Sequence, residues 1–538
     1  MTKEALMRHY MQAILCILAV MLAIAGRGPA LAEQKMRPIY VISDLHMGVG
    51  RANGQDWHPL EDFRWPRAFD GFLRQISKDH PDGVDLVIAG DFFELWQHPT
   101  VSCAKSPDPE CGCSIDEMKQ IVRDVLAGHR SEFAAIGRFL AGGANRVFVM
   151  PGNHDAALME DEIWVLVAQA VPEGRERFER VKSETWFSAD NKVAIEHGHQ
   201  NAFDANFFPD WPKSVTKNCA DGKRFFRPWG ENFVQALYNG VEAQFLLIDN
   251  LIPESLGTSI YYQYSKQKGK TVKEVARFVI FNLLQTSPYQ KIAFLDVNKE
   301  RTRLTERSLD FCRRCIGEDL ILRSPEGDRY KSLYGVEGTE QEKAFRLELR
   351  QQVASLDKNA VRDLCERVAV ANKGRLKSNP DLESQPGCEG TLGTVANKIF
   401  DPDGVHALGT RINKLENQKP ALLIYVFGHT HEAKVVMQVP VYDGSIIKTL
   451  NTGAFQRLMD KKFFENSKKA GENDVELLKR LTHDDMKACY TALTVTYDDK
   501  SRPQAELRQW YMTEGASDDG AFLTDCNLDC SARPANCR

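Results

Sequence analysis

Short apolar runs alternate with longer segments of helical spacing through the first part of the chain. Short apolar runs bounded by polar or turn residues are typical of buried strands, and apolar positions three and four apart predict helices. The predicted strands are 38–42, 85–89, 146–150 and 192–195, and the predicted helices between them are 68–77 and 118–140. This alternation predicts an α/β fold with much parallel strand pairing.

The pattern changes after residue 205, where strand signals become few. Apolar or charged amphipathic stripes then predict helices at 231–249, 272–284, 340–356 and 358–372. Strands are predicted again at 421–427 and 446–450, followed by a hairpin of 491–497 and 505–511. We therefore expect a core in two parts, 33–205 and 400–515, with a helical insertion at 206–399 that is a candidate cap.

The first residues have the features of an export signal. Basic residues near the start precede an apolar run at about 11–25, and Ala-Leu-Ala at 30–32 fits a cleavage site. A membrane anchor is the alternative, but the apolar run is short for a bilayer span, which needs about 20 residues. We expect a cleaved signal peptide at 1–32 and a periplasmic or secreted protein.

The thirteen cysteines point the same way. Removing Cys16 with the signal leaves an even number, which in an exported chain favours disulfides. Cys312 and Cys315 have the spacing of a zinc or redox pair, but structural disulfides are the favoured interpretation. The segment 516–538 is predicted to be a cysteine-rich tail tied by disulfides, and spacing alone does not give the pairing.

Composition excludes one class of function. The chain is 43% hydrophobic and 27% charged, as in an ordinary globular protein, and its net charge is -5. It therefore lacks the basic footprint of a nucleic-acid-binding protein. An acidic substrate would have to be held locally, by metal ions or a few basic side chains.

Five short polar motifs follow predicted strands. They are Ser-Asp-Leu-His at 43–46, Gly-Asp-Phe-Phe-Glu at 90–94, Gly-Asn-His-Asp at 152–155, Glu-His-Gly-His at 196–199 and Gly-His-Thr-His at 428–431. Each supplies oxygen or imidazole donors of the kind that divalent metals bind. Two metals about 3.5–4 Å apart can generate a nucleophile from water and clamp a phosphoryl group, with a shared carboxylate between them.

No single motif is specific. Asp-Trp-His at 56–58 repeats the spacing of the first motif without a predicted strand before it, so this spacing alone is close to noise. The inference depends on five motifs in order, each after a strand.

The ordered motifs resemble the calcineurin-like metallophosphoesterase superfamily over about 38–203 and 421–454. The resemblance implies two mixed β-sheets packed face to face and flanked by helices. It also implies a dinuclear metal site. One ion would be held by Asp44, His46 and His431, and the other by Asn153, His197 and His429, with Asp91 bridging them.

The resemblance further implies a mechanism. A metal-bridging hydroxide would attack phosphorus in line, while His154 contacts the phosphate and assists the leaving group, steadied by Asp155. A histidine can donate a proton near neutral pH, which suits this role. His199 is the alternative to His197, and we expect Glu94 to orient a ligand. Manganese, zinc or iron would suit the donors.

The resemblance implies that the substrate is a phosphate ester of a small molecule or a lipid. The segment 90–96 resembles the branch of UDP-2,3-diacylglucosamine pyrophosphatases, although that branch usually has arginine at the position of His154 and a cytoplasmic substrate. A lipid-phosphate or nucleotide-linked pyrophosphatase at a membrane surface is therefore the alternative function. A catalytically silent metal-binding scaffold is disfavoured because all the expected ligands are present. A phosphoprotein phosphatase is less favoured, since no arginine follows the second motif closely.

Overall fold

The computed structural model contains two compact units, Met1–Arg37 and Pro38–Arg538. The described residues are 36–52, 56–101, 103, 108–201, 206–252, 256–257, 260, 264, 405–440, 446–512 and 520–523. The predicted signal peptide at 1–32, the predicted helices at 272–284, 340–356 and 358–372, and most of the predicted tail lie outside these residues. No helix of the described part is long and apolar enough to cross a membrane.

The second unit contains a seven-stranded sheet in the order β19-β18-β17-β1-β4-β6-β7. Its strands are β1 Ile39–Ile42, β4 Asp85–Ala89, β6 Arg146–Met150, β7 Phe178–Arg180, β17 Cys489–Tyr497, β18 Pro503–Tyr511 and β19 Ala521–Leu523. The four strands from β1 to β7 are parallel, and β17 is antiparallel to both β1 and β18. The predicted strands and hairpin of this sheet are confirmed.

A second sheet has five strands in the order β14-β15-β13-β9-β8. They are β8 Trp186–Phe187, β9 Val193–Ile195, β13 Ile424–Phe427, β14 Lys434–Pro440 and β15 Ile446–Asn451. β13 is parallel to β9 on one side and to β15 on the other. Segments on either side of the predicted insertion therefore form one sheet.

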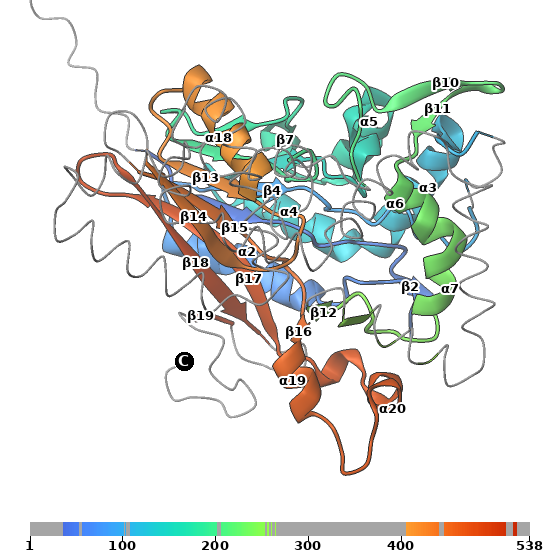
Figure 1. Cartoon of the computed structure of the whole chain (residues 1–538). Helices are drawn as coiled ribbons and strands as arrows, with labels where there is room; N and C mark the ends of the chain where they lie inside the picture. The colour runs from blue at the N-terminus through green and yellow to red at the C-terminus, as the bar shows by residue number, and fades with distance from the viewer. Residues whose placement is uncertain are drawn as a thin grey trace, which may run out of the picture. The chain divides into compact units, whose positions relative to one another are not determined.

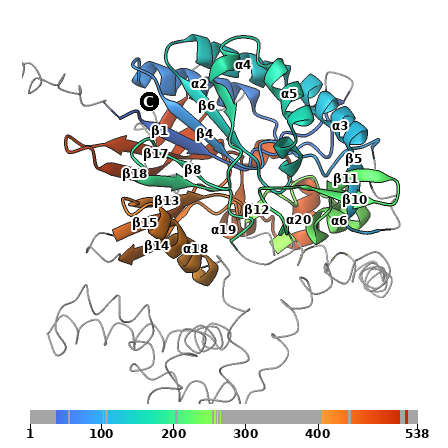
Figure 2. The same cartoon turned by 90° about the horizontal axis from the view of Figure 1, so that it is seen from above.

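The alternation of side chains along β1 shows how the layers are built. Ile39 and Val41 lie in a buried cluster with residues of the second sheet, such as Val426, whereas Tyr40 and Ile42 lie in a cluster with the helices. Neighbouring residues of a strand point to opposite faces, so the first sheet is buried on both sides. The two sheets pack face to face, as Figure 2 shows.

Helices cover the outer faces of both sheets (Figure 1). The helices α2 Pro66–Asp79, α3 Ile115–Gly128, α4 Arg130–Ala141 and α5 Asp161–Ala170 pack on the seven-stranded sheet. The helix α18 Val405–Gln418 packs Ile412 and Leu415 against Tyr425 of the five-stranded sheet. The predicted class, α/β with two mixed sheets flanked by helices, is confirmed.

One predicted helix, 118–140, is divided in the structure. It forms α3 and α4, which meet at His129. The backbone at Gly128 runs so close to another loop that an added Cβ would lie 2.5 Å from the carbonyl oxygen of Val49. The His129 ring is buried, with Nδ1 2.9 Å from Oε1 of Glu132 and Nε2 3.3 Å from Oε1 of Glu61. These tertiary contacts override a continuous helical pattern.

The start of the predicted insertion contains strands as well as helices. β10 Thr216–Cys219 and β11 Gly222–Phe226 form a sheet with β5 Cys111–Ser114, and β12 Leu251–Ile252 pairs with β16 Met459–Asp460. The predicted helix 231–249 is shorter, consisting of α6 Trp229–Phe233, η3 Val234–Tyr238 and α7 Asn239–Glu242. Residues 206–252 therefore pack into the same core as the sheets rather than forming a purely helical insertion.

Two disulfides stabilise this region, Cys103–Cys113 and Cys111–Cys219. The second joins β5 to β10. Three residues of the predicted tail form β19 at the edge of the large sheet. The remaining short elements are β2 Arg51–Ala52, β3 Asp56–Trp57, η1 Ala156–Met159, η2 Arg175–Arg177, α19 Lys461–Asn466, α20 Asp474–Arg480 and η5 His483–Asp485.

Candidate metal centre

The five motifs follow the carboxyl ends of β1, β4, β6, β9 and β13. Parallel strands present these ends at one edge, which is where open α/β sheets usually place their sites. Backbone hydrogen bonds connect the loops. The amide of Asp44 donates to the carbonyl of Gly90 at 3.1 Å, and the amide of Gly428 donates to the carbonyl of His197 at 2.8 Å. The motifs are thereby held together in pairs, one pair on each sheet.

Five of the predicted ligands have a left-handed backbone, which is uncommon for residues other than glycine. Their φ angles are Asp44 53°, His46 52°, Asp91 48°, His429 73° and His431 57°. Only two further non-glycine residues of the described part share this conformation. Strained backbone of this kind persists where the surrounding structure fixes it, and it clusters at functional sites.

Two glycines allow the loops to approach closely. A Cβ added to Gly90, whose φ is 93°, would overlap the imidazole of His197. A Cβ added to Gly152 would overlap the carboxylate of Asp91. Any side chain at these positions would displace a predicted ligand.

The first group of donors is Asp44, His46 and His431. One donor atom from each lies within 4.8 Å of the others. The Nε2 atoms of His46 and His431 are 3.3 Å apart, and Nε2 of His431 is 3.5 Å from Oδ1 of Asp44. The structure therefore brings together the three residues assigned to one ion.

The second group is Asp91, His197 and His429, whose donor atoms satisfy the same distance limit. The Oδ1 atom of Asn153 lies 2.9 Å from Nε2 of His197, and Nδ2 of Asn153 is buried with no hydrogen-bond partner in the described part of the chain. Burial, followed by the charge of His197, lowers the pKa of His429 to about 3. A neutral His429 keeps a lone pair for a metal.

Asp91 lies between the two groups. Its Oδ2 atom is 3.0 Å from Nε2 of His197 and 3.8 Å from Nε2 of His46. Its Oδ1 atom accepts a hydrogen bond from the amide of His154 at 2.8 Å. Burial would raise the pKa of Asp91, but the nearby imidazoles, His197 first, hold it well below its usual range. An ionised Asp91 therefore faces both groups.

Oxygen and imidazole donors in this arrangement fit divalent metal ions. The donor atoms converge from five loops, they are almost all buried, and the groups combine carboxylates with imidazoles. Manganese, iron and zinc all accept such donors.

His154 lies beside these groups without belonging to the two ligand sets. Its Nδ1 atom is 2.5 Å from Oε2 of Glu94, and the same oxygen is 3.2 Å from Nδ1 of His46. The Trp96 ring stacks on the His154 ring, with centroids 3.8 Å apart. Burial would raise the pKa of Glu94, but the imidazoles of His154 and then His46 together lower this pKa to about 2. Glu94 is thus an ionised partner of His154.

The expected contact between Asp155 and His154 is not found among the described residues. The Asp155 carboxylate accepts hydrogen bonds from the amides of Phe92 at 2.8 Å and Gly152 at 2.6 Å. Burial, followed by the charge of Asp91, raises the pKa of Asp155 to about 7. Asp155 therefore fixes the loops of the second and third motifs, while Glu94 holds His154. Asp155 directly follows His154 in the sequence, but its carboxylate is directed into the protein. The sequence alone does not reveal this direction.

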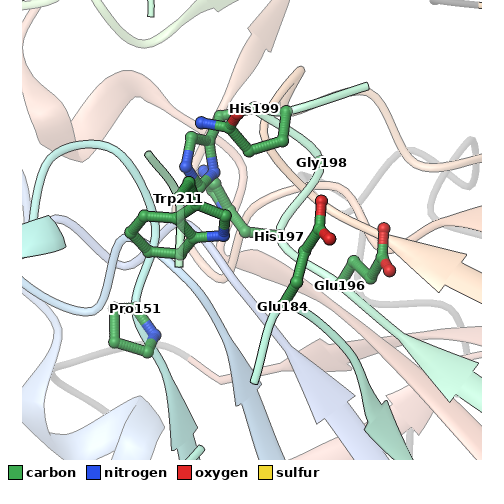
Figure 3. A pocket seen from close by; sticks show the side chains of 8 residues that line it. Pro151, Glu184, Glu196, His197, Gly198, His199 and Trp211 are labelled. Carbon is green, nitrogen blue, oxygen red and sulfur yellow. The ribbon is translucent and has the colours of Figure 1, made fainter. Parts of the chain in front are cut away.

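His199, the alternative ligand, is outside the groups described above. Its ring packs edge-on against Trp211, with centroids 4.6 Å apart. Figure 3 shows His199 and Trp211 lining a small pocket beside His197, with Glu184 and Glu196 at one side. His197, and not His199, forms the donor group with Asp91 and His429. The ring centroid of His199 lies 6.4 Å from that of His429, against 5.1 Å for His197.

Arg411 and Tyr425 support the site but belong to none of the five motifs. The Glu196 carboxylate, directly before His197, accepts hydrogen bonds from Nε of Arg411 at 3.0 Å and from the hydroxyl of Tyr425 at 2.9 Å. Arg411 belongs to α18, just after the predicted insertion. No sequence motif surrounds this arginine, so the sequence alone did not identify it.

The segment 451–453, at the end of β15, supports the fifth motif. The Asn451 amide donates to the carbonyl of Gly428 at 2.9 Å and to the hydroxyl of Thr430 at 2.8 Å. The hydroxyls of Thr452 and Ser43 are 2.6 Å apart. These contacts hold the fifth motif against the first.

Comparison with known proteins gives one family match. Residues 37–236 match the model of the calcineurin-like phosphoesterases. The match covers the first four motifs and ends before His429 and His431. No curated protein matches the chain. The match supports membership of the calcineurin-like superfamily and indicates a metal-dependent phosphoesterase, a hydrolase of phosphate esters.

Proposed function

We propose that the chain is an exported hydrolase that cleaves phosphate esters at a dinuclear metal site. The observation that carries this proposal is the position of Asp91. One of its carboxylate oxygens lies 3.0 Å from an imidazole nitrogen of one donor group and 3.8 Å from an imidazole nitrogen of the other. A shared carboxylate is the natural bridge of a metal pair.

The assignment of ligands follows the two groups. Asp44, His46 and His431 would hold one ion, and Asn153, His197 and His429 would hold the other. Asp91, which faces both groups, would contribute to both sites. When bound, a pair of manganese, zinc or iron ions makes water nucleophilic near neutral pH and neutralises charge on the phosphoryl oxygens.

His154 is proposed as the general acid. Its Nδ1 atom is held by Glu94, so Nε2 is the nitrogen available to a substrate. As the bond from phosphorus to the leaving oxygen breaks, the proton on Nε2 passes to that oxygen and the alcohol departs neutral. Trp96 fixes the plane of the ring.

The test compares two esters with added manganese. p-Nitrophenyl phosphate and bis-p-nitrophenyl phosphate distinguish monoesterase from diesterase activity. We expect turnover of at least one ester, lost in Asp91→Asn. Metal-loaded protein with no turnover of either ester would contradict this proposal.

The nearest substrate class is suggested by the segment 90–96. Its resemblance to UDP-2,3-diacylglucosamine pyrophosphatases supports a lipid-phosphate or nucleotide-linked pyrophosphate substrate at a membrane surface as the alternative function. His154 in place of the usual arginine is the departure from that branch. Liposome binding together with cleavage of a diphosphate diester would favour this alternative, and phosphate-monoester turnover without liposome binding would exclude it.

Export is supported by the disulfides Cys103–Cys113 and Cys111–Cys219, because such bonds persist in oxidising compartments. Sequencing the N-terminus of the mature protein after expression in a bacterial host tests this. A mature chain that begins near residue 33 in the periplasm is expected, and an uncut cytoplasmic chain would contradict it.

A further inference from the structure

Three carboxylates gather outside the metal centre. Asp62, Glu242 and Asp249 each offer an oxygen within 4.8 Å of the others. Asp62 lies between β3 and α2, Glu242 is the last residue of α7, and Asp249 lies before β12. The cluster therefore joins the first part of the core to the segment 206–252.

Two of these carboxylates lack a direct ionic partner. Asp62 and Glu242 are only 7% and 1% exposed, and within the described residues no ion pair with lysine or arginine is found for either. The guanidinium of nearby Arg64 donates to the carbonyls of Glu61 at 2.8 Å and His58 at 3.0 Å, so its charge acts on Asp62 and Glu242 only through space. Burying carboxylates together is costly unless they are protonated or bind a cation.

A buried carboxamide supplies the second observation. Gln97 is 3% exposed, and its Nε2 atom donates to Oε2 of Glu242 at 2.6 Å. The amide is therefore directed into the cluster, yet its Oε1 atom is buried and has no hydrogen-bond partner among the residues that the structure describes. An unpaired carboxamide oxygen beside carboxylates is a donor that a hard cation accepts.

We propose that Asp62, Glu242, Asp249 and Gln97 form a binding site for a calcium ion, separate from the catalytic metals. All the donors are oxygens, with no imidazole or thiolate, which favours calcium over zinc. Calcium also tolerates irregular geometry, as expected of donors from three separate segments, whereas magnesium demands a near-ideal octahedron.

Burial, followed by the charge of Asp249, raises the pKa of both Asp62 and Glu242. This agrees with a cluster that needs a cation. Gln97 follows Trp96, whose ring stacks on His154. A bound ion would therefore tie the segment 206–252 to the loop that positions the proposed general acid.

Terbium luminescence and thermal unfolding test the site on the full chain. Terbium replaces calcium, and Tyr238, whose hydroxyl donates to Oδ1 of Asp249 at 2.5 Å, is placed to sensitise its emission. We expect tyrosine-sensitised emission that calcium displaces, and a melting temperature that calcium raises. Glu242→Gln should weaken terbium binding by at least about tenfold, since loss of partners around a metal already costs that much.

Two controls keep the test specific. Glu173→Gln, at an exposed carboxylate, should bind terbium as the wild type does. Asp44→Asn, at the catalytic centre, should also keep the calcium-displaceable emission. If Glu242→Gln is poorly folded by circular dichroism, Asp62→Asn replaces it.

The proposal is contradicted by wild-type protein whose melting temperature and terbium emission do not respond to calcium, which would indicate protonated carboxylates without a cation. Emission lost in Asp44→Asn but kept in Glu242→Gln would also overturn it, because the ion would then occupy the catalytic centre.

Discussion

At the scale of single residues, the proposed chemistry depends on proton transfer from His154. Glu94 holds one ring nitrogen, Trp96 covers the ring face, and the side chain remains 20% exposed. The ring is therefore fixed in orientation but open to a substrate on one side. The Glu94 carboxylate that holds His154 also contacts His46, a predicted metal ligand.

Replacing His154 by alanine should separate metal binding from proton transfer. We expect His154→Ala to keep its metals and to lose about 10²–10⁴-fold in turnover of an alkyl phosphate ester. The loss should be much smaller for a nitrophenyl ester, whose leaving group needs little protonation. His58→Ala is the matched control, because His58 belongs to the Asp-Trp-His segment at 56–58, which supplies no predicted ligand. Equal losses on both esters, or none on the alkyl ester, would argue against a general acid.

Replacing Glu94 by glutamine tests its assignment over that of Asp155. The Glu94 carboxylate contacts the His154 ring, whereas the Asp155 carboxylate binds backbone amides. Glu94→Gln should therefore lower kcat for an alkyl ester by roughly tenfold or more with little loss of melting temperature. Asp155→Asn should mainly lower the melting temperature. The reverse pattern in parallel kinetic and thermal measurements would restore Asp155 as the partner.

At the scale of elements, the junction of α3 and α4 is held by a buried ionic network. His129 lies between Glu61 and Glu132, and the Glu61 carboxylate also accepts a hydrogen bond from the amide of Gly48 at 3.1 Å. The continuous apolar pattern of 118–140 predicted helix correctly but could not reveal this junction. The break depends on a loop that lies far away in sequence.

The network should make stability depend on alkaline pH. Burial would lower the pKa of His129, but Glu61 and then Glu132 raise it from 6.5 to about 10. Because the folded-state pKa is the higher one, the stabilisation is complete below pH 6.5 and is lost as pH rises through about 10. The loss should reach up to about 5 kcal/mol. Denaturation at several pH values should show this dependence in wild type and not in His129→Gln, and equal slopes would contradict it.

The ion pair between Arg411 of α18 and Glu196, which follows β9 of the second sheet, gives a further prediction. The side chains of Arg411 and Glu196 are 11% and 5% exposed. Arg411→Ala leaves a buried carboxylate directly before His197 and should cost about 3 kcal/mol. The double variant Arg411→Ala with Glu196→Gln should recover part of this loss in urea denaturation. A single variant within about 0.5 kcal/mol of wild type would show that the pair contributes little.

At the scale of the whole molecule, the motifs made the core predictable, and they also predicted that the proposed ligands lie close together. Each motif follows a strand, and strand ends place their residues at one edge of the sheet. The role of Asp155 was not predictable, because its carboxylate turns toward backbone amides. The strands within 206–252 were also missed, since β10 and β11 are short, polar and held by pairing with the distant β5.

The disulfide between Cys111 and Cys219 should stabilise this arrangement across the chain. It closes a sequence separation of 108 residues, and closing long loops constrains the unfolded chain strongly. The variant with alanine at both positions should lose about 2–5 kcal/mol in a denaturant titration. Unchanged stability of that variant would show that the β5, β10 and β11 sheet holds without the bond.

The number of ions bound per chain tests the dinuclear site most directly. Elemental analysis of manganese-loaded wild type should give two ions per chain, not counting any ion that calcium displaces. Asp91→Asn should lose at least one of these two ions, together with turnover. A fully active wild type with a single such ion, or an Asp91→Asn variant that keeps both ions and full turnover, would contradict the bridging role of Asp91.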